Sequence, residues 1–137
     1  MEANWIFREY QEIDLPFIFN SWLRASWDAW PFAKDMRKTV FFEMHHDLIN
    51  KRISKKEISV VVACAKDGPS DILGYIAFSQ KTGSLHFVYV KGAFRKLGIG
   101  KSLFETRIFK FHTHETNMLS FLKLDTIYNP YLFIENL

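Results

Sequence analysis

The chain has 137 residues, of which 48% are hydrophobic and 24% are charged. This length suits one domain over residues 1–137, with a core that needs neither disulfides nor a metal, and the composition excludes a disordered or membrane-spanning chain. The formal net charge of +3 is too small to indicate a nucleic-acid-binding protein by itself.

The first predicted elements are a strand over residues 4–11 and a helix over residues 14–27. Asp14 suits the N-cap position of this helix. Residues 1–10 lack the basic start and the long apolar stretch of a signal peptide, so we expect a cytoplasmic protein. The helix carries an apolar stripe formed by Leu15, Ile18, Phe19, Trp22 and Leu23.

A second helix is predicted from about Asp35 to Arg52, after Pro31 has ended the first helical pattern. The cations near its end suit a helix C-terminus, where they meet the negative end of the helix dipole. The side predicted to face the core holds Val40, Phe41, Met44, Leu48 and Ile49.

Three strands are predicted next, over residues 57–65, 72–80 and 84–92. The first is nearly all apolar, as in a strand that is covered on both faces, and it contains Cys64, which we expect to be a buried and inert thiol. Residues 67–71 have the composition of a turn.

The last predicted elements are a helix over residues 100–112, a strand over residues 118–124 and a tail. The resulting order is β-α-α-β-β-β-α-β, which predicts a layered α/β domain with helices against a mixed, mostly antiparallel sheet. The residues of the last helical region expected to face inward are Ile99, Leu103, Phe104, Ile108 and Phe111.

A glycine-containing loop, FRKLGIGKS over residues 94–102, lies between the third of these strands and the next helix. A P-loop would need glycine at Arg95, and a dinucleotide-binding fingerprint would need glycine at Leu103. Glycines beside cations at a helix start still predict a phosphate cradle, because successive backbone N–H groups bind anions there.

The pattern of Arg95, Gly98 and Gly100 resembles motif A of the GNAT acetyltransferase superfamily, and the resemblance extends over residues 1 to about 125. It implies a GNAT-like fold and an acetyl-CoA-dependent N-acetyltransferase acting by direct attack of the amine. The length is similar to that of small phage-encoded GNAT-like proteins. The residues implied to bind acetyl-CoA are Phe87, Val88, Tyr89, Val90, Arg95, Lys96, Leu97, Gly98, Ile99, Gly100, Lys101 and Ser102.

The same resemblance implies a general base and a general acid. His86 is the titratable side chain of the strand that precedes the loop, so it is either the base or a packed strand histidine. The family places a tyrosine acid after its fifth strand, where Tyr128 and Tyr131 lie, and each of them is either that acid or a core ring.

Aromatic side chains in the first helix and the following loop border the acceptor in the family, where they either form a pocket wall or plug the sheet. The histidine pairs at residues 45–46 and 112–114 lack a carboxylate or cysteine at ligand spacing, so we expect surface histidines and no metal. The residues expected to bind the acceptor are Trp22, Trp27, Trp30 and Phe32.

An alternative is a non-catalytic GNAT-like module that binds coenzyme A or a protein partner. We expect a small-molecule or protein amine as acceptor and no membrane, and a nucleic-acid partner ranks last. The tail over residues 128–137 is apolar and contains Pro130, which predicts an extended segment that pairs with its own sheet or with a second copy in a homodimer.

Overall fold

The computed structural model describes residues 4–95, 97–105, 107–116 and 125–134. Its centre is a six-stranded sheet in the order β1-β2-β3-β4-β5-β6. The first four strands are antiparallel to their neighbours, and β5 and β6 continue the sheet in parallel. The predicted mixed, mostly antiparallel sheet is therefore confirmed. Its strands are β1 (Trp5–Glu9), β2 (Ser59–Ala65), β3 (Gly68–Ser79), β4 (Ser84–Val90), β5 (Phe111–His112) and β6 (Ile127–Tyr128).

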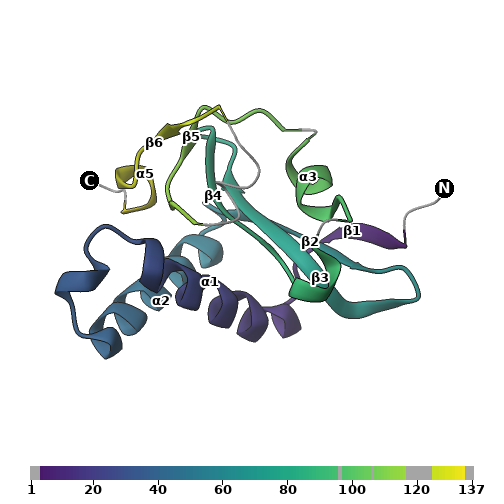
Figure 1. Cartoon of the computed structure of the whole chain (residues 1–137), viewed down its shortest axis with the longest axis horizontal. Coiled ribbons are helices and arrows are strands. Elements are labelled where there is room, and N and C mark those ends of the chain that lie inside the picture. The colour runs from purple at the N-terminus through teal and green to yellow at the C-terminus, as the bar shows by residue number, and fades with distance from the viewer. Residues whose placement is uncertain (1–3, 96, 106, 117–124, 135–137) are drawn as a thin grey trace.

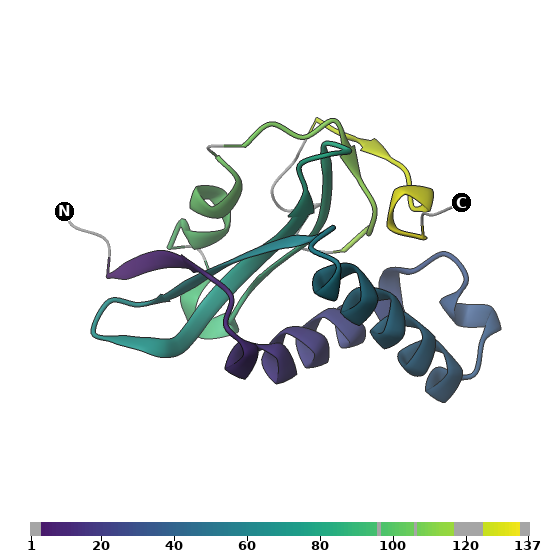
Figure 2. The same ribbon diagram turned by 180° about the vertical axis from the view of Figure 1, so that it is seen from behind.

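Helices cover both faces of this sheet (Figures 1 and 2). The helices α1 and α2 cover one face over a core that includes Trp22, Phe41 and Phe87, and α3 covers the other face over Ile76 and Leu103. No helix within the described residues is both long and apolar enough to cross a membrane. The helices are α1 (Leu15–Ala29), α2 (Lys38–Ser54), α3 (Ile99–Phe104) and α5 (Tyr131–Ile134), with 3-10 turns at Glu12–Asp14, Ala33–Asp35 and Gly92–Phe94.

The first helix forms as predicted, but Asp14 does not cap it. A 3-10 turn leads directly into α1, and the Asp14 carboxylate turns back to accept hydrogen bonds from the Gln11 N–H at 2.7 Å and from Arg8 at 2.7 and 3.0 Å. This buried ion pair fastens β1 to the start of α1.

The second helix is rotated relative to the prediction. Val40 and Met44 are exposed, whereas His45 is buried between Phe41 and Ile49 on the inner face. The sequence pattern ranks methionine above histidine as a core residue, but the cavity at this position is lined by aromatic rings, which a flat imidazole fits.

The helix predicted over residues 100–112 is shorter in the structure. It ends at Phe104, and Ile108, expected to face inward, is 94% exposed. The N–H groups of Lys110 and Phe111 donate to the Gly83 carbonyl, which draws the chain onto the free edge of β4 as β5. Pairing of an open sheet edge thus overrides the helical spacing. The Ile99 and Leu103 side chains are buried as expected.

Two other predictions have different outcomes. Residues 68–71, assigned to a turn by composition, form the start of β3, whereas Cys64 is buried as expected. The strand predicted over residues 118–124 lies outside the described residues.

The tail is not extended. Residues 131–134 form the short helix α5, which places Phe133 in the core beside Trp22 and Trp30. Pro130 precedes this helix instead of interrupting it, since proline is compatible with a helix start. The chain therefore buries this apolar residue on its own core, and the homodimer expected from an extended tail stays a prediction.

Candidate active site

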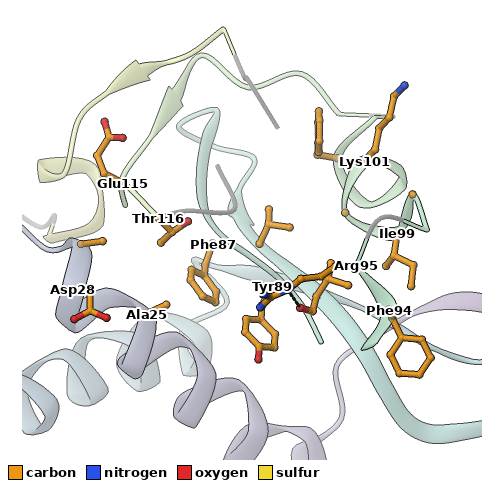
Figure 3. A pocket seen from close by; sticks show the side chains of 16 residues that line it. Ala25, Asp28, Phe87, Tyr89, Phe94, Arg95, Ile99, Lys101, Glu115 and Thr116 are labelled. Atoms are coloured by element: carbon orange, nitrogen blue, oxygen red, sulfur yellow. Dashed lines mark hydrogen bonds between the residues drawn. The ribbon is translucent and has the colours of Figure 1, made fainter. Parts of the chain in front are cut away.

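A single large pocket of about 940 Å³ lies between β4, the end of α1, the start of α3 and the segment after β5 (Figure 3). Hydrophobic side chains make up most of its wall, and four charged side chains stand at its two ends. Its lining residues are Ala25, Asp28, Ala29, Phe87, Val88, Tyr89, Val90, Phe94, Arg95, Gly98, Ile99, Gly100, Lys101, Phe104, Glu115 and Thr116.

The pocket exists because two neighbouring strands separate. β4 and β5 pair only at Ser84 with Phe111 and at Leu85 with His112. Beyond that point β5 ends, while β4 continues to Val90 along the pocket wall. A strand edge that loses its partner presents backbone N–H and C=O groups to whatever fills the gap.

The ladder between β3 and β4 indicates which groups of β4 face that gap. The Lys91 N–H donates to the Leu73 carbonyl, and hydrogen-bonded pairs alternate along an antiparallel ladder, so Tyr89 also bonds toward β3. Val88 and Val90 then direct their backbone groups to the opposite side. The carbonyl of Val90 accepts a hydrogen bond from Arg95 Nε at 2.8 Å on that side.

A β-bulge interrupts β4 near its start. Ala77 pairs with Phe87 and Phe78 pairs with Leu85, so His86 is the extra residue. The bulge turns His86 toward Phe133 on the side of α1 and α2, where it is fully buried and bonds to Thr113 Oγ1 through Nδ1 at 2.8 Å.

His86 does not line the pocket. Burial, and secondarily the positive charge of Arg52, lower the pKa of His86 to about 3. A group this weakly basic is poorly matched to taking a proton near neutrality. The geometry therefore favours the packed-histidine interpretation of this residue.

The glycine loop forms one end of the pocket. Gly98 has φ +89° and is the residue from which α3 starts. The Ser102 N–H donates to the Gly98 carbonyl at 2.9 Å as the first helical bond, so the N–H groups of Ile99, Gly100 and Lys101 have no acceptor within the helix.

The other residues expected at this loop differ in position. Arg95 and Lys101 line the pocket, and the Arg95 guanidinium also lies over the Tyr89 ring at 5.7 Å. Leu97 is exposed, and neither it nor Ser102 lines the pocket. Lys96 lies outside the described residues.

Two carboxylates stand at the opposite end of the pocket, away from Arg95 and Lys101 (Figure 3). Asp28 comes from the last turn of α1, and Glu115 comes from the segment after β5. Glu115 Oε1 lies 3.0 Å from His112 Nε2, and His112 Nδ1 lies 2.7 Å from Thr126 Oγ1. The half-exposed Glu115 side chain can exchange protons with solvent.

Thr116 lies beside Glu115 in the same wall. Its side chain is only 5% exposed, and its buried Oγ1 has no hydrogen-bond partner in the described part of the chain. Sequence reasoning missed this end of the pocket, since Asp28 and Glu115 are 87 positions apart and no motif joins them.

The two tyrosines expected as acid candidates lie outside the pocket. Tyr128 stacks on His112 at 5.4 Å, and burial together with the negative charge of Glu115 raises its pKa. Tyr131 is exposed on α5. Tyr128 is thus linked to the pocket only through the contact between His112 and Glu115.

None of the four aromatic residues expected to bind the acceptor lines the pocket. Trp22 is fully buried and stacks on Phe87 at 5.4 Å, while Trp27 packs on Phe41. Trp30 packs against buried rings, and Phe32 is exposed. Trp22 supports the pocket wall from behind, because Phe87 lies between it and the cavity.

The histidines expected on the surface form a buried network instead. His45 Nε2 lies 3.1 Å from His114 Nε2, which also accepts a hydrogen bond from Trp22 at 3.3 Å. The other ring nitrogen of His114 lies 2.9 Å from Thr113 Oγ1, which reaches His86. Among the described residues no cluster of three or more histidine, cysteine or carboxylate side chains could hold a metal ion.

Comparison with protein families gives one match. The model of the acetyltransferase (GNAT) domain matches residues 30–126, which is most of the chain and includes the glycine loop and β4. A comparison with curated proteins finds no match.

Solved structures share the fold. A candidate acetyl transferase from Pyrococcus furiosus has a TM-score of 0.57 at 19% identity, covering 74% of this chain and 70% of that one. The PaiA N-acetyltransferase from Thermoplasma acidophilum, solved with coenzyme A, has a TM-score of 0.48 at 21% identity over 76% and 69% of the two chains. Spermidine N-acetyltransferase from Vibrio cholerae, solved with coenzyme A and spermine, has a TM-score of 0.49 at 16% identity over 77% and 62%.

Proposed function

Because this chain belongs to the GNAT acetyltransferase family, we propose that its pocket binds acetyl-CoA at the Gly98 end and an amine acceptor at the Glu115 end, and transfers the acetyl group between them. The family uses acetyl-CoA as the donor. The observation that carries the proposal is that one pocket contains both the glycine loop and the unpaired edge of β4.

The residues at the Gly98 end fit the pyrophosphate of coenzyme A. The left-handed conformation of Gly98 turns the N–H groups of Ile99 and Gly100 to the same side, as in an anion-binding nest. Arg95 and Lys101 add two positive charges beside them. Glycine at residue 98 also leaves open space where a Cβ would project.

The edge of β4 fits the arm that carries the thioester. Val88 and Val90 turn backbone groups toward the gap, so an extended amide chain can bond there as a strand would. A backbone N–H on this edge can donate to the thioester carbonyl oxygen, where negative charge develops during acyl transfer.

We assign the base to Glu115. Its carboxylate takes one proton from the acceptor ammonium, and the hydrogen bond from His112 holds the carboxylate in place at 3.0 Å. Acetyl-CoA supplies the acetyl group when bound: the amine nitrogen forms the new C–N bond, the C–S bond breaks, and the thiolate leaves with the electron pair and takes up the second amine proton. Glu115 then returns its proton to solvent.

The test is amine-dependent thiol release from acetyl-CoA, measured with the wild type and with Glu115→Gln. We expect the variant to bind acetyl-CoA as the wild type does and to lose roughly a hundredfold in kcat, the usual contribution of a general base. Glu43→Gln, on the exposed face of α2, is the matched control.

Two outcomes contradict the proposal. A wild type that binds acetyl-CoA but releases no thiol with a panel of amines is the non-catalytic module described above. A Glu115→Gln variant with unchanged kcat places the base elsewhere.

A further inference from the structure

We propose that the acceptor is an aliphatic amine with a second positive charge, recognised by Asp28 while its reacting amino group lies between Glu115 and Thr116. This inference rests on the proposed acetyl transfer and specifies its substrate class. The juxtaposition that carries it is a carboxylate on α1 facing the same pocket end as the carboxylate and hydroxyl that follow β5 (Figure 3).

The charges of the pocket are segregated. Among the described lining residues, the cationic side chains are Arg95 and Lys101 at the loop end, and the anionic ones are Asp28 and Glu115 at the other end. A donor with a pyrophosphate is attracted to the first end and repelled from the second. A cationic acceptor has the opposite preference, so charge alone sorts the two substrates.

Thr116 provides the independent indication that a polar ligand group belongs here. Its buried Oγ1 lacks a partner within the described residues, although a buried hydroxyl normally has one. An amino group that donates to this oxygen would satisfy it. The carboxylate of Glu115, one residue away, accepts a proton from the same group.

Asp28 then has no role in the chemistry of the reacting nitrogen, because Glu115 already supplies the base. It belongs to the opposite wall, on the last turn of α1, beside Ala25 and Ala29. These small side chains leave room for a methylene chain to pass along the wall toward the Asp28 carboxylate.

Three acceptors of equal chain length test the inference: diaminobutane, butylamine and aminobutyrate. They end in a cation, a methyl group and a carboxylate, respectively. We expect KM to be lowest for diaminobutane and highest for aminobutyrate, with roughly a fivefold step for the added cation, since Asp28 is exposed and its ion pair is screened.

The Asp28→Asn variant should remove most of this difference between diaminobutane and butylamine, improve aminobutyrate, and leave the KM for acetyl-CoA unchanged. Asp47→Asn, an exposed aspartate on α2, is the matched control. Equal KM values for diaminobutane and butylamine in the wild type, or an unchanged ratio in Asp28→Asn, would overturn the inference while leaving acetyl transfer intact.

A binding measurement separates this inference from the proposed function. With the protein saturated with coenzyme A, calorimetry should detect diaminobutane binding that is weakened in Asp28→Asn. If no amine is acetylated but this binding is seen, acetyl transfer fails and the dication site stands. If diaminobutane releases no heat in the wild type, the site is wrong whatever the activity.

Discussion

Gly98 determines the shape of the loop end of the pocket. Its φ of +89° is a conformation that residues with a Cβ rarely adopt, and a Cβ built there meets no atom within 4 Å. The cost of a substitution is therefore backbone strain and occupied pocket space, not a clash in the core. Gly83 has φ +68° and lies in the turn between β3 and β4, away from the pocket.

This pair of glycines allows a controlled prediction. Gly98→Ala and Gly83→Ala should each lower the free energy of unfolding by about 1–2 kcal/mol, the usual cost of left-handed backbone for a residue with a Cβ. Only Gly98→Ala should also weaken acetyl-CoA binding, measured by calorimetry. Equal affinities of the two variants for acetyl-CoA would show that the loop does not hold the donor.

At the scale of elements, α5 depends on the helical layer for its position. The Phe133 ring contacts Trp22, Trp30 and His45, and the Phe133 carbonyl accepts a hydrogen bond from Arg52 at 2.6 Å. A four-residue helix has no stability of its own, so these tertiary contacts hold it.

We therefore expect Phe133→Ala to lower the free energy of unfolding by about 3–5 kcal/mol, as for other large aromatic residues truncated in a core. Tyr131→Ala, on the exposed side of the same turn, is the control and should change stability little. Urea unfolding at several protein concentrations measures both. Similar midpoints for the two variants would contradict docking of the tail on its own chain.

At the scale of the whole molecule, the buried histidines connect α1, α2 and the segment after β5. The Trp22 indole can only donate, so His114 Nε2 accepts, and the protons on His45 Nε2 and His114 Nδ1 complete the bonds. Every ring in this arrangement is neutral. Burial lowers the pKa of His45 to about 3, and burial followed by the charges of neighbouring histidines holds that of His114 well below its usual range.

Stability should consequently fall on acidification. Below the usual histidine pKa of 6.5 the unfolded chain binds protons that the folded chain does not, so the free energy of unfolding decreases as the pH falls from there toward about 3. Each such histidine contributes a slope of about 1.4 kcal/mol per pH unit.

Urea unfolding between about pH 7 and about pH 5 measures this slope before carboxylates titrate. His45→Phe, which suits the aromatic surroundings, should reduce the slope, whereas His46→Gln on the outer side of α2 should change it much less. A wild type whose stability is constant over this range would show that the buried rings are not neutral as described.

The sequence by itself determined the order of the main elements and the donor loop. Apolar periodicity is a local property, so the strands β2 to β4 and the helix α1 could be predicted from it. Gly98 could be identified as well, because a glycine at the start of a helix after a strand indicates a backbone requirement that neighbouring residues reveal.

Only the tertiary structure decided which residues meet across the pocket. The pairing of β5 with β4 overrode a helical pattern, and that pairing brings Glu115 and Thr116 opposite Asp28. The same packing turned His45 inward and closed His86 off from the cavity. These outcomes depend on contacts between segments far apart in the chain, and burial changes the chemistry of a histidine in a way that its residue type does not reveal.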